Sequence, residues 1–196
     1  WMGEILFRTR LSENLFKGLS PWMQKLPGGL IHVNVVGCAL FAAISGSSAA
    51  TVATVGKMSI PELRKRNYPE KILLGSLAGS GTLGLLIPPS IILIIYGVAV
   101  QESIAKLFIA GILPGIMIAL IFMSYVIFWS LINKKQMPKI IEEYSIFEKI
   151  KRSKQLLPVI FLISAVIGSI YTGIATATEA ASLGVVGALI LSYFQK

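Results

Sequence analysis

The apolar residues of this chain occur in continuous runs close to the roughly 20 residues that a membrane-spanning helix requires. The longest runs lie in residues 30–55, 72–100, 114–133 and 156–171. Strands of a membrane β-barrel are shorter and alternate apolar with polar side chains, so the runs do not fit barrel strands. With 55% hydrophobic and 14% charged residues, the 196-residue chain has too few polar side chains to cover a soluble globule. The sequence therefore predicts an all-α integral membrane protein.

The positive charge is distributed as in a membrane protein. Lys and Arg total 18, against nine acidic residues, and they cluster between the apolar runs, as they do in cytoplasmic loops. The clusters are Arg64-Lys65-Arg66, Lys134-Lys135 and residues 149–154. Two crossings separate the first cluster from the second, so we expect residues 57–71 and 134–155 on the same, cytoplasmic face. No basic patch is interleaved with aromatic residues, and nucleic acid is not an expected partner.

The first interruption of an apolar run is Ser45-Gly46-Ser47-Ser48, within residues 28–56. About 28 residues are too few for two complete spans of about 20 each. The segment is either one long span or a re-entrant hairpin that enters and leaves the membrane on one side. Before it, residues 1–27 place apolar side chains at helical spacing among polar ones, which predicts an interfacial arm helix that stops at Pro27-Gly28-Gly29.

The second interruption runs from Gly79 to Pro89. Its first residues match the G-x-G-x-x-G pattern of dinucleotide-binding loops, but no strand precedes the match and Pro88-Pro89 follows it inside an apolar run, so nucleotide binding is rejected. Two successive prolines remove two backbone donors and free carbonyls one turn earlier. In hydrocarbon, each such group costs several kcal/mol unless protein, water or an ion satisfies it. We therefore expect a helix that breaks inside the membrane.

Together the two interruptions predict a cation site made of neutral oxygens, where the serine-rich segment meets the broken helix. The chain contains no Asp, and only Glu4 and Glu179 among its nine Glu are candidates for membrane depth. Neutral oxygens suit Na⁺ better than Mg²⁺ or Ca²⁺, which usually recruit carboxylates. A proton relay is disfavoured because it usually needs an intramembrane Asp, Glu or His. We expect Na⁺ as the coupling ion and no organic cofactor.

Residues 57–133 are expected to hold the interrupted transmembrane helix, a short helix and a following span. Ser103 is predicted to cap the short helix, which should end near Gly111 and Pro114-Gly115.

Residues 134–155 then alternate apolar and charged side chains, which predicts an amphipathic linker on the cytoplasmic surface. Residues 156–196 are expected to begin a second half, as in transporters with inverted repeats. In that half, Thr178 is predicted to cap a helix that carries Glu179 in its first turn.

Two functions other than transport fit a membrane protein with these residues. An intramembrane serine protease could pair His32, the only histidine, with Ser47, Ser48 or Ser80, but the sequence has no G-x-S-x-G elbow. His32 is therefore predicted to be structural. A structural or regulatory membrane subunit that does not transport is the other alternative. Each serine of the interruptions, taken singly, also fits a packing role, but packing alone leaves unsatisfied the backbone that two interruptions within about 45 residues expose.

Four sequence blocks, taken in order, resemble the large membrane subunit of tripartite ATP-independent periplasmic (TRAP) transporters. They are Ile44-Ser45-Gly46-Ser47-Ser48-Ala49-Ala50-Thr51, Tyr68-Pro69, the segment from Gly81 to Ser90 with Pro88-Pro89, and the segment from Ser103 to Gly115 with Leu107-Phe108-Ile109-Ala110-Gly111. The resemblance extends over almost the whole chain. It implies an elevator-type fold of the ion-transporter superfamily, in a bacterial inner membrane.

The resemblance also implies a mechanism and partners. Such a carrier imports an organic acid with sodium, receives it from a soluble periplasmic binding protein and is flanked by a small four-helix membrane subunit. The serine-rich motif becomes the tip of a re-entrant hairpin. The residues implied to bind Na⁺ are Ser45, Ser47, Gly84, Ile87 and Pro89, and those implied on the substrate side are Ser48 and Thr82.

Two departures from the family pattern limit what the resemblance implies. Thr176-Ala177-Thr178-Glu179-Ala180 lacks the proline that usually follows the first threonine, so this helix should break less sharply. The second hairpin and its sodium site are expected beyond Lys196. The chain opens Trp1-Met2-Gly3-Glu4, unlike a natural N-terminus, and we expect about one half of the full subunit.

Overall fold

A computed structural model describes residues 4–5, 11–138 and 144–194, and the regular structure in these ranges is helical. Three described stretches are long and apolar enough to cross a membrane: Glu70–Val100, Ile104–Ile132 and Ile146–Tyr171. The prediction of an all-α integral membrane protein is confirmed.

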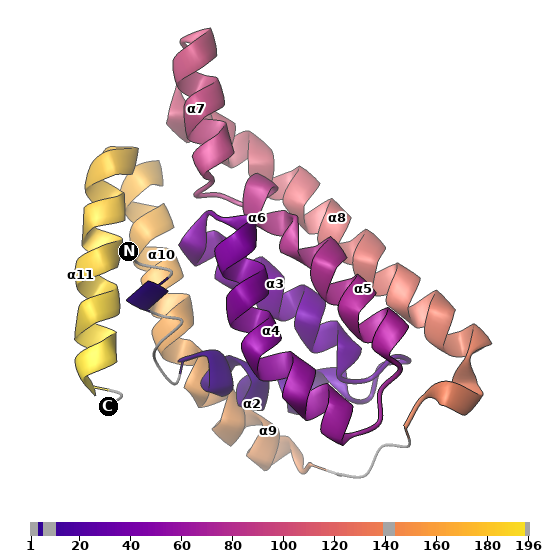
Figure 1. Cartoon of the computed structure of the whole chain (residues 1–196). Coiled ribbons are helices and arrows are strands. Elements are labelled where there is room, and N and C mark those ends of the chain that lie inside the picture. The colour runs from indigo at the N-terminus through magenta and orange to yellow at the C-terminus, as the bar shows by residue number, and fades with distance from the viewer. Residues whose placement is uncertain (1–3, 6–10, 139–143, 195–196) are drawn as a thin grey trace.

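Two helices, α3 (Ile31–Ser45) and α4 (Ser48–Lys65), form a hairpin, in which α3 lies at the centre of the bundle and α4 packs against it (Figure 1). Beyond α4 the chain returns to the start of α3, where the Leu30 backbone N–H donates a hydrogen bond of 3.0 Å to the Tyr68 hydroxyl. Burial raises the pKa of this phenol, and the Leu30 hydrogen bond opposes the shift. Because both ends of the segment meet, its geometry is that of a hairpin, and its re-entrant placement in the membrane stays a prediction.

The second arm of the hairpin is longer than the sequence indicated. The expected boundary at residue 56 followed the change from apolar to charged residues, but α4 continues to Lys65. Its buried face, carried by Thr51 and Val55, continues with Ser59 and Leu63 at helical spacing. This face packs on α3 and α5. Its burial stabilises the helix through residues 57–65, although the opposite side of that segment is charged.

Helix α3 carries apolar side chains around its circumference, which is typical of a helix that other helices surround. The helices in contact with it are α2 (Leu11–Met23), α4, α5 (Glu70–Gly81), α6 (Leu83–Leu86), α8 (Ile104–Ile132) and α10 (Leu157–Tyr171). Gly37 of α3 faces Val55 of α4, where a Cβ would lie in ordinary van der Waals contact at 3.6 Å. The hairpin is therefore held as the core of the bundle.

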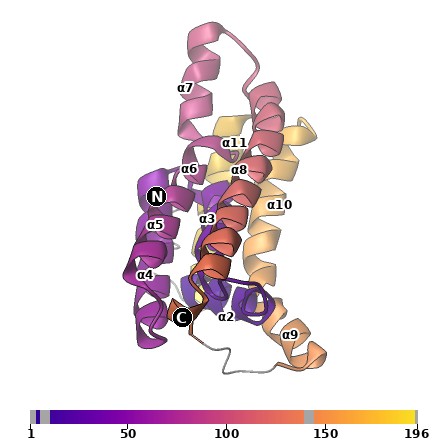
Figure 2. The same cartoon turned by 90° about the vertical axis from the view of Figure 1, so that its right-hand side faces the viewer.

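The interrupted helix follows the hairpin. It consists of α5, the single turn α6 and α7 (Ile91–Val100), which is joined to α8 by a turn with Gln101 in the left-handed conformation. Figure 2 shows α7 and the start of α8 extending beyond the rest of the bundle as a pair. The break between α6 and α7 lies beside the tip of the hairpin.

Two details predicted for residues 103–133 are wrong. The short helix and the following span are one helix, α8, which passes through Pro114, and the Ser103 side chain forms no capping hydrogen bond. The glycines read as helix ends instead allow close packing. A Cβ on Gly111 would lie 3.0 Å from the Leu86 carbonyl oxygen, and one on Gly115 would lie 2.9 Å from Ile87.

The basic end of the bundle holds α9 (Ile146–Ser153) between the short 3-10 helices η1 (Lys134–Gln136) and η2 (Lys154–Leu156). Residues 139–143 of the predicted amphipathic linker lie outside the described residues. Helix α9 packs on α2, where the Trp22 indole N–H donates a 2.8 Å hydrogen bond to Ser153.

At the C-terminal end, α10 and α11 (Ala177–Phe194) pack against each other. The residue that caps α11 is Thr176, not the predicted Thr178. The Thr176 hydroxyl accepts from the Glu179 N–H at 3.3 Å, and the Glu179 carboxylate accepts from the Thr176 N–H at 2.8 Å. This reciprocal pair is a capping box, which satisfies two backbone donors at once.

Candidate functional site

The turn between α3 and α4 has only two residues, Gly46 and Ser47. Gly46 ends α3 in the left-handed conformation, with φ of 59°, which glycine adopts without steric cost. Ser47 is extended and begins α4, with its hydroxyl accepting from the Ala50 N–H at 3.4 Å. The turn places the serine hydroxyls at the apex of the hairpin.

The second half of the site is the break between α6 and α7. Pro88 and Pro89 have no N–H groups, so the carbonyls of Gly84 and Leu85 lose the donors that a continuous helix would supply. The Ser90 hydroxyl donates to the Leu85 carbonyl at 2.6 Å, while the Ile87 N–H donates to Leu83 at 2.8 Å. The Ser90 hydroxyl thus replaces the missing donor at the Leu85 carbonyl, whereas neither the Ser90 hydroxyl nor the Ile87 N–H donates to the Gly84 carbonyl.

The hairpin tip and the break are in direct contact, as the two interruptions predicted. A Cβ on Gly84 would lie 2.8 Å from the Ser48 backbone nitrogen and 3.0 Å from the Ser47 carbonyl oxygen. A Cβ on Gly46 would lie 2.6 Å from the Pro89 carbonyl oxygen. The Ile91 N–H points to the Gly46 carbonyl at 3.5 Å. Glycine at both positions is what allows the two backbones to approach.

Three hydroxyls at the tip have different environments. The Ser45 Oγ lies 2.9 Å from the Thr51 Oγ1 and accepts from the Ser47 N–H at 3.3 Å. Ser45 thus also holds the turn together. The Ser48 Oγ is buried and has no hydrogen-bond partner among the residues that the structure describes. Because an unpaired buried hydroxyl is costly, Ser48 is the tip residue most in need of a ligand.

The structure brings most of the predicted residues together, but it leaves Thr82 apart. The Thr82 side chain is exposed, and its hydroxyl donates to the Gly79 carbonyl of its own helix at 2.7 Å. Ile87 packs beside Gly115 of α8. Sequence reasoning gave no role to Thr51 or Ser90, although Thr51 lies six residues after Ser45 across the turn and Ser90 directly follows the proline pair.

A cavity of about 220 Å³ lies beside the tip. Ser45, Gly46 and Ser90 form its polar edge. Its other walls are apolar and come from α7, α8, α10 and α11, including Phe108 and Ile170. The described residues hold no cluster of three or more His, Cys, Asp or Glu side chains. The arrangement thus offers neutral oxygens, next to a small apolar space, to any ion bound at the tip.

His32 lies at the opposite end of the hairpin from the tip serines. It is the second residue of α3, whereas Ser45 is the last. At 1.5 Å per residue, this places their backbones roughly 20 Å apart. The His32 ring nitrogen Nε2 lies 2.8 Å from the Pro27 carbonyl oxygen. A hydrogen bond there would tie the turn before α3, and His32 does not reach Ser47 or Ser48 as a catalytic base.

The profile described as "Tripartite ATP-independent periplasmic transporter, DctM component" matches residues 1–196.

Three relatives illustrate the similarity. The C4-dicarboxylate TRAP transporter large permease protein DctM of Pseudomonas aeruginosa is 39% identical over 167 residues, covering 85% of this chain and 38% of that protein. The ectoine/5-hydroxyectoine TRAP transporter large permease protein UehC of Ruegeria pomeroyi is 34% identical over 188 residues, covering 96% and 43%. The sialic acid TRAP transporter permease protein SiaT of Haemophilus influenzae is 34% identical over 185 residues, covering 94% and 29%. The chain spans less than half the length of each relative.

Proposed function

This chain belongs to the DctM component family of tripartite ATP-independent periplasmic transporters, and from this premise we propose that it forms the first hairpin and broken helix of a sodium-coupled importer of organic acids. The contact between the hairpin tip and the break is the observation that carries the proposal. It brings Gly46 and the Ser47-Ser48 backbone against Gly84 and Pro89, where two prolines have removed backbone donors.

Sodium is the ion that this chemistry favours. Ser45, Ser47 and the carbonyls of Gly84, Ile87 and Pro89 are the proposed ligands, and all are neutral. A monovalent ion can rest on such oxygens without the carboxylates that Mg²⁺ and Ca²⁺ usually recruit. The surrounding helices are apolar, which strengthens the attraction between the ion and the oxygen dipoles.

The substrate is proposed to bear a carboxylate. The relatives' names include C4-dicarboxylate and sialic acid, both of which carry that group. The buried Ser48 hydroxyl, which lacks a partner, is the proposed substrate contact in this half. Thr82 stays a prediction, and its side chain would have to leave the Gly79 carbonyl to take that role.

The hairpin and the broken helix are proposed to move as one body. Close glycine contacts at Gly46 and Gly84 join them, and α3 is buried between α4 and α5. Separating them would expose apolar surface and backbone groups together, so a rigid elevator motion costs less than opening the contact. A periplasmic binding protein and a small four-helix membrane subunit are the proposed partners, in a bacterial inner membrane.

Uptake by the full-length subunit tests the proposal. It would be reconstituted in liposomes with the small subunit, and its binding protein and a radiolabelled acid would be supplied outside. We expect uptake that needs an inward sodium gradient and falls at least tenfold with Ser47→Ala. Ser124→Ala is the matched control, because this exposed serine only donates to the Leu120 carbonyl of its own helix. Uptake that ignored both sodium and Ser47→Ala would overturn the coupling proposal.

The same samples separate the alternatives. A structural or regulatory subunit predicts no substrate-dependent response. An intramembrane protease predicts cleavage of a membrane substrate that is lost with Ser47→Ala and with His32→Ala.

A further inference from the structure

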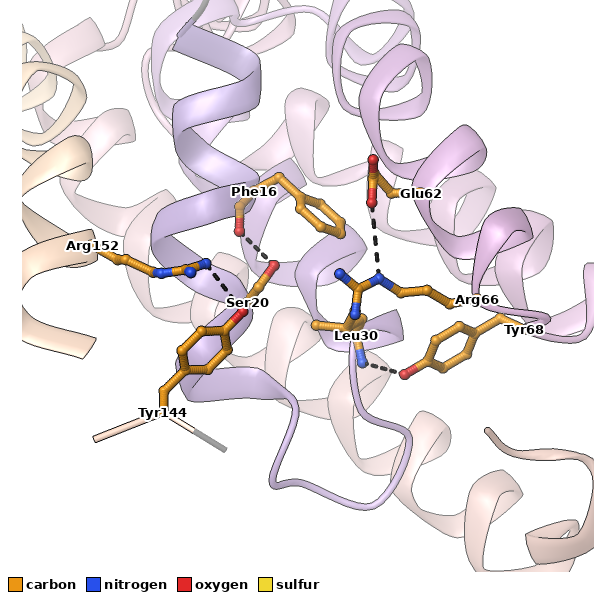
Figure 3. Close-up of polar contacts among 8 residues, drawn as sticks. All are labelled: Phe16, Ser20, Leu30, Glu62, Arg66, Tyr68, Tyr144 and Arg152. Carbon is orange, nitrogen blue, oxygen red and sulfur yellow. Dashed lines mark hydrogen bonds and ion pairs between the residues drawn. The ribbon is translucent and has the colours of Figure 1, made fainter. Parts of the chain in front are cut away.

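A second pocket lies far from the hairpin tip, at the basic end of the bundle. It has a volume of about 430 Å³ and lies between α2, α4 and α9. Figure 3 shows Arg152 and Arg66 reaching toward each other from opposite sides, with Ser20 and the Phe16 ring between them. Three segments that are distant in sequence thus form one recess that the transport site does not use.

The described lining of this pocket carries more basic than acidic side chains. Four basic side chains line it, Lys17, Lys57, Arg66 and Arg152, against the two acidic side chains Glu13 and Glu62. Lys17 pairs with Glu13 at 3.3 Å, and Arg66 with Glu62 at 3.8 Å. Among the described residues that line the recess, basic side chains thus outnumber acidic ones by two.

Arg152 is oriented by Tyr144 rather than by an acid. Its guanidinium donates to the Tyr144 hydroxyl at 3.1 Å and lies 4.2 Å from the centre of the ring. A guanidinium held in this way keeps further N–H groups for a planar anion such as a phosphate. The buried Ser20 and Phe16 form the neighbouring wall, so the pocket combines a fixed cation with apolar surface.

Apolar side chains beside the pocket indicate where the anion comes from. On α9, Ile146, Phe147 and Ile150 are 74%, 77% and 53% exposed. Lys149 of the same helix lies 5.4 Å from the Trp22 ring, and Trp22 is itself 46% exposed. Exposed apolar and aromatic residues among lysines and arginines are typical of a surface that meets lipid headgroups.

We propose that this pocket binds the phosphate of an anionic phospholipid headgroup. Basic pockets at the cytoplasmic ends of membrane helices attract such headgroups, and each Lys or Arg contributes about fivefold in affinity. A soluble phosphate has the same charge chemistry, but it leaves the apolar side chains of α9 without a partner. The lipid would tie the arm helix α2 and α9 to the base of the hairpin arm α4.

Thermal unfolding of the purified full-length subunit in detergent tests this proposal. Titrated phosphatidylglycerol is expected to raise the unfolding temperature, whereas phosphatidylcholine and inorganic phosphate at equal concentration are expected to leave it unchanged. The double variant Lys17→Gln/Lys57→Gln should weaken the phosphatidylglycerol response about 25-fold. The matched control is Lys65→Gln/Lys71→Gln, which removes two exposed lysines that do not line the pocket.

Single Lys57→Gln provides a milder test, with an expected loss of about fivefold, should the double variant unfold without lipid. Equal responses in the pocket and control variants would overturn the proposal. A response to inorganic phosphate that matches the response to phosphatidylglycerol would overturn the lipid source and indicate a site for soluble anions.

Discussion

Replacing Gly84 with Ala should separate the hairpin tip from the break. The new Cβ would lie 2.8 Å from the Ser48 nitrogen, 2.9 Å from the Ser47 carbonyl carbon and 3.0 Å from the Ser47 oxygen. All three are backbone atoms, so no side chain can turn aside. Ordinary van der Waals contact begins at 3.4 Å, so the hairpin tip would have to move away from Gly84 by about 0.6 Å.

The effect on sodium binding can be estimated from this clash. Overpacking a well-packed site costs about 1–3 kcal/mol. If the proposed ion binds only while the tip is docked, that cost appears in its affinity. At about 1.4 kcal/mol per tenfold, sodium affinity should fall roughly 5- to 150-fold.

The assay is the rise in unfolding temperature of the full-length protein as NaCl replaces choline chloride at constant ionic strength. Gly75→Ala is the control, because a Cβ on Gly75 meets nothing within 4 Å. We expect Gly84→Ala to shift the sodium titration to higher concentration and Gly75→Ala to leave it in place. If both variants kept the wild-type sodium affinity within twofold, sodium would not bind between the hairpin tip and the break.

Three further predictions follow from hydrogen bonds in the described residues. Ser48→Ala removes a buried hydroxyl that has no partner, so the unfolding temperature without substrate should stay equal or rise, while uptake shows a higher KM. Tyr68→Phe removes the acceptor of the Leu30 N–H and should lower the free energy of unfolding by about 0.5–1.5 kcal/mol, measured by chemical denaturation. Thr176→Ala removes the capping box of α11 and should speed hydrogen exchange in its first turn by roughly 2- to 30-fold, whereas Thr178→Ala should not.

The sequence predicts the site well where a chemical constraint is local. Pro88-Pro89 must break a helix wherever it occurs, and Ser45-Gly46-Ser47-Ser48 must interrupt an apolar run. Placing these two breaks together required the further argument that exposed backbone in a membrane needs partners. The structure shows that the two breaks meet, while the ion site between them stays a prediction.

The wrong predictions for residues 103–133 concern residue types that occur both at helix ends and at close contacts between helices. Gly111 and Pro114 are typical of helix ends, but here Gly111 lets α8 pass close to the Leu86 carbonyl. That neighbour is distant in sequence, so no local pattern identified it. The cap of α11 was predictable, because Thr176-Ala177-Thr178-Glu179 fits the capping-box spacing, which places Glu three residues after the cap.

The roles of individual hydroxyls could not be derived from the sequence. The contact of Ser45 with Thr51 and the unpaired state of Ser48 depend on which way each side chain points at the tip. Helical spacing fixes the face of a helix on which a residue lies, but the partner is fixed by the opposing segment.

A sodium ion is proposed to lie between the hairpin tip and the break. The most direct measurement is a cryo-EM structure of the full-length subunit with its small partner, determined once in sodium and once in choline. We expect a density peak in sodium only, coordinated by Ser45, Ser47 and the carbonyls of Gly84, Ile87 and Pro89. A sodium structure with these oxygens turned away from one another and no peak among them would show that the ion does not bind at this contact.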